Sequence, residues 1–205
     1  MNKINTILVG THNKGKFKEI AYLLSKKIKK IAPHTLKIKS PRETGKTFIK
    51  NAILKANYFY KHSKIVSISD DSGLEIVSLN NAPGIYSARW AKKYGNFKKA
   101  MKKILYFLSK KKNRNAFFVC SLAIKFPQKK VIFVEGRIQG KIAHTIKGIK
   151  GFGYDPIFIP KNYKITFGQM SKFKKVKLDH RFIAFKKLKK KLKSSKLFIW
   201  CFINF

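Results

Sequence analysis

The chain has only eight acidic side chains among its 205 residues, so any acid, base or metal site must come from a short list. Two of them, Asp70 and Asp71, are adjacent in the segment SISDDSGLEI, where an apolar run meets Ser-Gly. Carboxylate oxygens are the ligands that hard cations such as Mg²⁺ prefer in proteins. A carboxylate that caps a turn is the alternative interpretation. The pair taken alone leaves both interpretations open.

The segment GTHNKGKF, residues 10–17, follows a predicted strand and precedes a predicted helix. It nearly matches the P-loop pattern GxxxxGK[ST], but Phe17 takes the place of the hydroxyl that would bind magnesium. Backbone N–H groups at a helix N-terminus still attract anions, and Lys16 adds a positive charge suited to phosphate. The segment favours a triphosphate ligand without a true P-loop. A strand-to-helix turn with incidental lysines is the alternative.

Two later segments contain groups suited to a purine base. In GIKGFGYDP, residues 148–156, glycines surround Phe152 and would let a flat ligand approach and stack on its ring, and Asp155 would accept hydrogen bonds. A tight turn that packs Phe152 and Tyr154 into the core is the alternative. His180-Arg181 combines donors suited to a purine carbonyl or a phosphate, and both residue types are scarce in this chain.

Strand-like and helix-like patterns alternate along the chain, which predicts an α/β protein with a mixed sheet. Strands are predicted at residues 5–9, 65–69, 74–79, 116–126 and 129–138, and helices at residues 17–30, 47–61, 97–108 and 180–193. The acidic pair directly follows the second predicted strand. Pro127 separates the two longest strands, which predicts an antiparallel pair.

The formal net charge of +40 comes from 48 basic residues against eight acidic ones, which suggests a nucleic-acid partner. Only five of the basic residues are arginine, the residue that nucleic-acid surfaces favour for bidentate contacts. The excess is lysine, which A- and T-rich codons favour, as they favour isoleucine, phenylalanine and asparagine. We therefore expect no stable nucleic-acid complex.

Two cysteines, Cys120 and Cys201, are too few and too far apart for a zinc site or a disulfide framework. A reducing cytoplasm is the expected location, and no signal peptide is recognised. The apolar run at residues 197–205 is only nine residues long, against the roughly 20 that a membrane-spanning helix needs. No membrane partner is expected.

In this order, the segments resemble the inosine triphosphate pyrophosphatase family, also described as dITP/XTP pyrophosphatases. The resemblance runs from residue 5 to residue 193. It is carried by THNKGK (11–16), ETG (43–45), Phe48 with Asn51-Ala52, DDSGL (70–74), PGIYSAR (83–89), GFGYDP (151–156) and His180-Arg181. Each motif alone is weak, but the ordered series is specific.

The resemblance implies an elongated mixed sheet with two lobes flanking a nucleotide cleft, usually in a homodimer. It implies one domain over residues 1–193, followed by a hydrophobic tail at residues 194–205. The implied reaction is Mg²⁺-dependent hydrolysis of dITP, ITP and XTP to the monophosphate and pyrophosphate, which keeps these nucleotides out of nucleic acid. A basic nucleic-acid-binding protein on a degenerate enzyme fold is the alternative.

The resemblance also implies roles for residues at matching positions. Asp71 would bind magnesium and activate water, with Glu43 as a second ligand and Asp70 in support. The phosphates would be held by Thr11, His12, Asn13, Lys14, Gly15 and Lys16, with help from Lys175. Ser72 and Gly153 would contact the substrate, Phe152 would stack on the base, and Tyr154, Asp155, His180 and Arg181 would read its edge.

Two departures concern the metal site. Some relatives carry glutamate where this chain has Arg42, and many carry it where this chain has Lys50. Losing two acids would weaken magnesium binding or leave it to Glu43 and Asp70.

Overall fold

A computed structural model describes residues 4–194 of the chain. The described residues form two compact units. The first unit comprises residues 4–71, 120–136 and 181–194, and the second comprises residues 72–119 and 137–180. Strands β3 (Ser67–Ile76), β5 (Asn115–Lys125) and β6 (Ile132–Ile142) contribute residues to both units.

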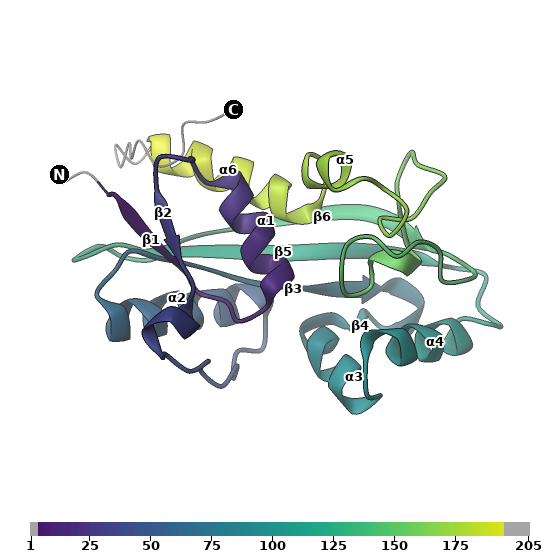
Figure 1. Ribbon diagram of the computed structural model, residues 1–205. Helices are drawn as coiled ribbons and strands as arrows, with labels where there is room; N and C mark the ends of the chain where they lie inside the picture. The colour runs from purple at the N-terminus through teal and green to yellow at the C-terminus, as the bar shows by residue number, and fades with distance from the viewer. Residues whose placement is uncertain (1–3, 195–205) are drawn as a thin grey trace. The chain divides into compact units, whose positions relative to one another are not determined.

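In the first unit the strand order is β2-β1-β3-β5-β6. Strand β1 (Thr6–Val9) pairs in parallel with β2 (Lys29–Ile31) and with β3, in the registers Thr6↔Lys29 and Leu8↔Ser67. Helices α1 (Lys14–Leu23), α2 (Phe48–Ser63) and α6 (His180–Ser194) accompany these strands, and Figure 1 shows α2 and α6 on opposite sides of them. Because the first unit is covered on both sides, β1 is an almost unbroken apolar run.

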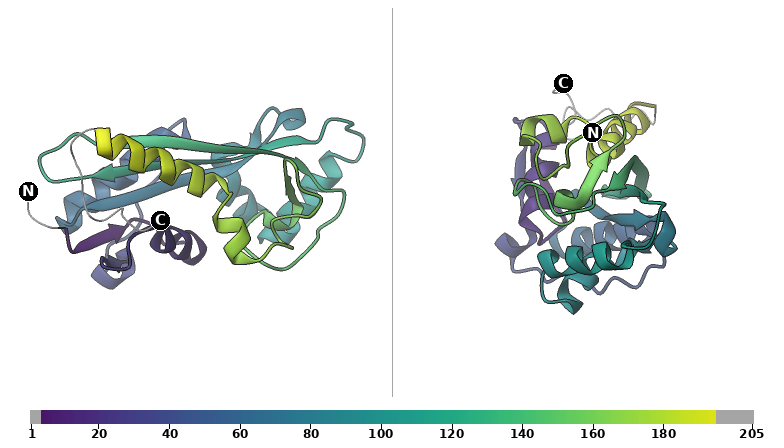
Figure 2. Two further views of the ribbon diagram at one scale, coloured as in Figure 1. Left: turned by 90° about the horizontal axis from the view of Figure 1, so that it is seen from above. Right: turned by 90° about the vertical axis from the view of Figure 1, so that its right-hand side faces the viewer.

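In the second unit β4 (Ala82–Pro83) pairs antiparallel with β3, and β7 (Phe158–Pro160) pairs antiparallel with β6 in the register Ile142↔Phe158. Its helices are α3 (Ser87–Lys93), α4 (Phe97–Phe107) and α5 (Lys172–Val176) (Figure 2). One apolar cluster that includes Leu74, Ile104, Phe118 and Phe167 forms the core. Short 3₁₀ turns lie at Pro33–Leu36, Val77–Leu79, Gly84–Tyr86 and Asp155–Ile157.

The predicted helix at residues 17–30 was wrong at both ends. Helix α1 starts at Lys14, where Asn13 caps it, and ends at Leu23, because Leu24 is already extended. Residues 29–31 form strand β2, which pairs with β1. The lysine-rich stretch that follows this short helix gave no sign of the pairing, because pairing between strands is a tertiary interaction.

The predicted turn after the acidic pair was also wrong. Asp70 and Asp71 lie inside β3, which runs without interruption from Ser67 to Ile76 and includes Ser72 and Gly73. The two strands predicted on either side of the pair are therefore one strand. Successive side chains of a strand point to opposite faces, so the two carboxylates are directed away from each other.

The helices predicted at residues 47–61, 97–108 and 180–193 are confirmed as α2, α4 and α6. Strands β5 and β6 are neighbours joined by residues 126–131, a connection too short for a parallel crossover, so the predicted antiparallel pair is confirmed as well. Among residues 4–194, no helix has both the length and the apolarity to cross a membrane. Most of the predicted tail, residues 195–205, lies outside the described residues.

Candidate functional site

The predicted phosphate segment lies between β1 and the start of α1. The Asn13 side chain accepts a hydrogen bond from the Lys16 backbone N–H at 3.0 Å, and the Thr11 hydroxyl accepts one from the Asn13 N–H at 3.2 Å. These bonds fix the turn and direct the N-terminus of a ten-residue helix away from the strand. Gly10 is required before the turn, because a Cβ there would lie 2.2 Å from the Ser69 hydroxyl.

His12 ties this segment to the loop that precedes α2. Its Nε2 lies 3.1 Å from the Ile38 carbonyl oxygen, and its Nδ1 lies 2.6 Å from the Ser40 hydroxyl. A carbonyl oxygen only accepts, so Nε2 is the protonated nitrogen, and in the neutral ring the Ser40 hydroxyl donates to Nδ1. Both ring nitrogens of His12 therefore contact the loop that continues to Glu43.

Asp70 lies on one face of β3 among other charged side chains. We call this set the Asp70 network, which comprises Lys16, Glu19, Asp70 and Arg181. The Arg181 guanidinium pairs with Glu19 and, at 3.1 Å, with Asp70, and the Lys16 ammonium lies 3.3 Å from Asp70. Burial alone would raise the pKa of Asp70, but Lys16, Arg181 and Lys55 outweigh it and hold that pKa well below its usual range. Asp70 is therefore a fixed anion that protein cations neutralise.

Asp71 belongs to a second set, the Asp71 network, which comprises Glu43, Lys55 and Asp71. The Lys55 ammonium lies 2.5 Å from Glu43 and 3.6 Å from Asp71. Burial raises the pKa of Asp71 above its usual value, although the cations Lys55 and Lys16 oppose the shift. Burial alone would lower the pKa of Lys55, but the surrounding carboxylates, Asp71 first among them, raise it.

Asn51 holds the Asp71 network in place from helix α2. Its side-chain N–H donates to Asp71 at 3.0 Å, while its side-chain oxygen accepts from the Gly45 backbone N–H at 2.7 Å. A Cβ on residue 45 would approach that oxygen to 2.5 Å, so glycine is needed there. The amide thus links the Glu43–Gly45 loop to the carboxylate of β3.

The two networks differ in net charge. The Asp70 network has two acids and two bases and is neutral, whereas the Asp71 network has two acids and one base and carries a net charge of −1. A surplus negative charge is notable in a chain with a net charge of +40. Among residues 4–194, no three His, Cys, Asp or Glu side chains gather closely enough to enclose a metal. Magnesium needs fewer, because one or two carboxylates together with substrate phosphates and water usually bind it.

Glu43 and Asp71 meet that requirement, because both carboxylates lie close to the same positive charge, the Lys55 ammonium. Arg42 and Lys50, where the resemblance led us to expect acids, are exposed. Asp70, by contrast, is taken up by Arg181 and Lys16.

In the second unit, the predicted base-binding residues surround a buried ion pair. The Lys175 ammonium lies 2.7 Å from the Asp155 carboxylate and 4.7 Å from the centre of the Phe152 ring. The same Asp155 oxygen accepts a hydrogen bond from the Phe152 backbone N–H at 2.8 Å. Gly151 is required beside it, because a Cβ there would lie 2.1 Å from that oxygen. The ring of Phe152 remains half-exposed.

Two other predicted base-reading residues make packing contacts in this unit. The Tyr154 hydroxyl donates to the Ser87 carbonyl at 2.9 Å, and its ring packs edge-on against Phe97. His180 is buried and stacks on Phe118, with ring centres 4.9 Å apart. Of the remaining predicted contacts, Ser72 and Gly153 are half-buried.

Sequence reasoning missed Glu19, Asn51 and Lys55 as site residues. A signal for two of them was present, because Asn51 and Lys55 fall on the same buried stripe of α2 as Ala52, Ala56 and Phe59. Polar side chains on a buried helix face need partners. Glu19 is likewise a polar side chain beside a buried apolar one, Ile20, on α1. Its partner Arg181, however, is 162 residues away in the sequence, so no local pattern indicated the pair.

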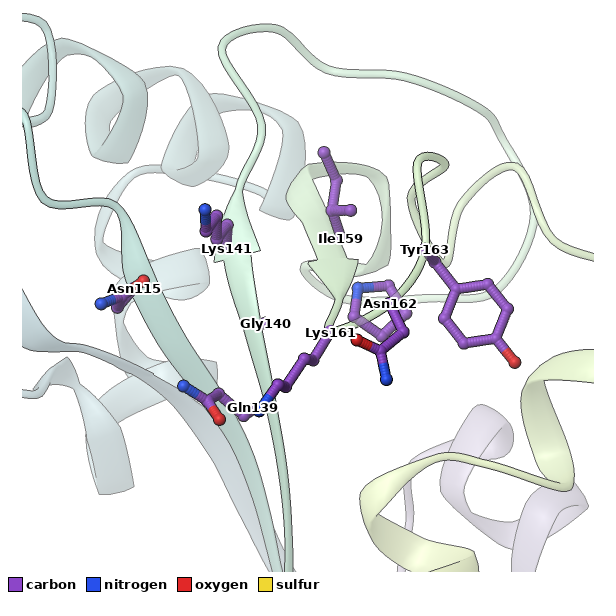
Figure 3. Close-up of a pocket in the computed structure, with 9 residues that line it drawn as sticks. Asn115, Gln139, Gly140, Lys141, Ile159, Lys161, Asn162 and Tyr163 are labelled. Carbon is purple, nitrogen blue, oxygen red and sulfur yellow. The ribbon is translucent and has the colours of Figure 1, made fainter.

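A separate pocket of about 360 Å³ lies along β6 and β7 in the second unit (Figure 3). Its lining includes Gln139, Lys141, Lys161 and Tyr163, and it contains none of the predicted site residues. Lysine makes up two of its nine lining residues, which matches lysine's share of the whole chain. The pocket therefore shows no enrichment in charge that would mark an anion site.

A mixed α/β sheet whose first strand leads through a tight turn into a helix N-terminus places the chain in the class of α/β proteins with an anion-attracting helix start. The chain belongs to the Ham1 family, whose family model matches residues 7–191. It is 41% identical over 185 residues to the dITP/XTP pyrophosphatase of Caulobacter vibrioides, covering 89% of this chain and 95% of that relative. The dITP/XTP pyrophosphatase of Haemophilus influenzae is 42% identical over 191 residues, covering 91% of this chain and 98% of that relative.

A solved structure of a HAM1 protein from Coxiella burnetii matches with a TM-score of 0.83 at 32% identity, and the match covers 93% of this chain and all of that one (100%). The family resemblance and the mixed α/β fold class are confirmed.

Proposed function

We propose that this protein hydrolyses non-standard purine nucleoside triphosphates, dITP, ITP and XTP, to the monophosphate and pyrophosphate. The observation that carries the proposal is the Asp71 network, which keeps a surplus negative charge in the same unit as the phosphate segment. Such a reaction keeps deaminated purines out of nucleic acid. The names of the curated relatives support the same activity.

The first unit would bind the phosphate chain and perform the hydrolysis. The N-terminus of α1 and the ammonium of Lys16 attract the triphosphate. Asp71 accepts a proton from water, whose oxygen attacks the α–β anhydride. The bridging P–O bond then breaks, and pyrophosphate leaves with the electron pair. Because burial raises the pKa of Asp71, this carboxylate is a stronger base than an exposed aspartate.

Magnesium fits the surplus charge of the Asp71 network, and Glu43 and Asp71 would hold it. When bound, it would supply a positive charge that stabilises the negative charge developing on the phosphate oxygens. Lys55 pairs with both carboxylates and so keeps them directed at one point. Asn51 donates a hydrogen bond to Asp71 and links it to the loop that contains Glu43. Asp70 keeps the segment around Lys16 in place through ion pairs.

The second unit would bind the base. The half-exposed ring of Phe152 provides a stacking surface, and the Lys175–Asp155 pair lies beside it. A 6-carbonyl purine presents an acceptor that a lysine ammonium satisfies, whereas the 6-amino group of adenine presents a donor, so this contact selects against dATP. Guanine shares the 6-carbonyl, so selection against dGTP would depend on its 2-amino group. His180, whose ring stacks on Phe118, would add to this discrimination, whereas Arg181 is paired with Glu19 and Asp70 in the first unit. We further propose a homodimer in the cytoplasm, which rests on the family resemblance alone.

Pyrophosphate release from dITP, XTP, dGTP and dATP with MgCl₂ tests the proposal. We expect turnover of dITP and XTP at least about tenfold faster than that of dGTP and dATP. Equal turnover of all four would reject the selective role, and no turnover of any would reject the activity.

A further inference from the structure

Glu19 is a buried acid of the Asp70 network to which the proposed reaction assigns no role of its own. It lies on α1 with 6% of its surface exposed, in a chain that has only eight acids. Burying a carboxylate is unfavourable unless it is paired, and an apolar side chain would pack at this position at less cost. Its partner is the Arg181 guanidinium, which is itself only 1% exposed.

Arg181 connects Glu19 to Asp70 in the middle of β3. Helix α1 therefore contacts Asp70 at two points, directly through Lys16 at 3.3 Å and indirectly through Glu19 and Arg181. Lys16 and Glu19 are three residues apart and so lie on one side of the helix. Two attachments on one side fix both the position of α1 and its rotation about its own axis.

That rotation decides where the Lys16 ammonium on the first turn of α1 points. The Asn13 cap and the Lys16 ammonium are on the first turns of the same helix, within six residues of Glu19. A small rotation about the helix axis would swing the Lys16 ammonium away from the phosphates, and a shift of α1 along its axis would move the terminal N–H groups. Misplacement of reacting groups by about 1 Å is able to reduce a rate by about 100-fold.

We propose that Glu19 is a positioning residue for the phosphate end of the site, which acts by holding Arg181 between α1 and Asp70. The inference rests on the proposed function, because it concerns how the triphosphate is oriented.

The test is Glu19→Gln, which removes the charge and keeps the size. The matched control is Glu135→Gln in the same unit, a half-buried carboxylate that accepts a hydrogen bond from Ser121 at 2.9 Å. We expect kcat for dITP to fall about 10- to 100-fold in the first variant and less than about twofold in the control. Calorimetric titration with MgCl₂ and a non-hydrolysable imido analogue of ITP should show about tenfold weaker binding, whereas IMP should bind within about twofold of the wild type.

A role in stability alone would lower the melting temperature and leave the ratio of analogue to IMP affinity unchanged, which would overturn the inference. Glu19→Asp keeps the charge but shortens the side chain, so it should show a smaller loss of the same selective kind. If Glu19→Gln does not fold, Glu19→Asp decides, and wild-type values in that variant overturn the inference. In an Asp70→Asn background, Glu19→Gln should cause no further loss in analogue binding. Failure of the wild type to hydrolyse any nucleotide would reject the proposed function instead.

Discussion

The Lys55–Asp71 pair of the first unit and the Lys175–Asp155 pair of the second are both buried, and their surroundings differ. Lys55 lies between Asp71 and a second carboxylate, Glu43, so the Asp71 network has two acids and one base. Lys175 lies between Asp155 and the face of the Phe152 ring, so the second unit's pair is neutral and adjoins an apolar surface. The same two residue types therefore lie beside a second carboxylate in one unit and beside an aromatic ring in the other.

The largest expected effect comes from removing the surplus carboxylate. Asp71→Asn keeps the shape of the side chain but removes the base and one metal ligand, so kcat for dITP should fall by at least about 1,000-fold. Urea unfolding should remain cooperative, with a midpoint near that of the wild type, because burial opposes the charge that is removed. Steady-state kinetics and equilibrium unfolding measure the two quantities.

Glu135→Gln is the control for Asp71→Asn, since it removes a carboxylate of the first unit that belongs to neither network. Retained hydrolysis in Asp71→Asn would move the base away from Asp71. Asp71 would then no longer distinguish the chemistry of the first unit from that of the second.

A smaller effect distinguishes the two lysines. Lys55→Met changes the net charge of the Asp71 network from −1 to −2, so Mg²⁺ should bind at least about tenfold more tightly in the absence of nucleotide. Lys175→Met leaves a single carboxylate that already accepts the Phe152 N–H, so no gain in Mg²⁺ affinity is expected. Both variants should lose about 3–5 kcal/mol of unfolding free energy without metal, because each leaves a buried charge without its lysine.

Calorimetric titration with MgCl₂ and melting temperatures measured with and without the metal check this pair of variants. Magnesium should restore stability to Lys55→Met and not to Lys175→Met. Lys61→Met, an exposed lysine of the same helix α2, is the control for the change in overall charge and should respond as the wild type does. Equal metal responses in the two buried variants would contradict the difference between the units.

The sequence predicted the local parts of this site and missed the long-range ones. The phosphate segment was recognisable because a strand, a turn and a helix start follow one another within a dozen residues. The course of β3 through Asp70 and Asp71 was not, because Ser-Gly has low strand propensity and pairing with neighbouring strands decides the conformation. The resemblance implied different roles for Asp70 and Asp71, and their positions on opposite faces of that strand, which the sequence did not predict, give a physical reason for the difference.

The smallest expected effect concerns Tyr154, which the motif assigned to the base and the structure places in the core. Tyr154→Phe removes a hydroxyl that donates to the Ser87 carbonyl and keeps the ring against Phe97. Burial raises the pKa of this hydroxyl, so it is a neutral donor at any working pH. Loss of one such hydrogen bond should lower the unfolding free energy by about 1 kcal/mol and change kcat/KM for dITP by less than about twofold.

Tyr106→Phe is the control for this change, because Tyr106 is 69% exposed and its substitution should alter neither quantity. A tyrosine that reads the base would behave differently, since an unpaired polar group in a binding site discriminates strongly between substrates. A loss of more than about tenfold in kcat/KM, confined to 6-carbonyl purines, would therefore show that Tyr154 contacts the base. The neutral Lys175–Asp155 pair would then share base recognition with a core residue, and the second unit would discriminate by hydrogen bonding as well as by stacking.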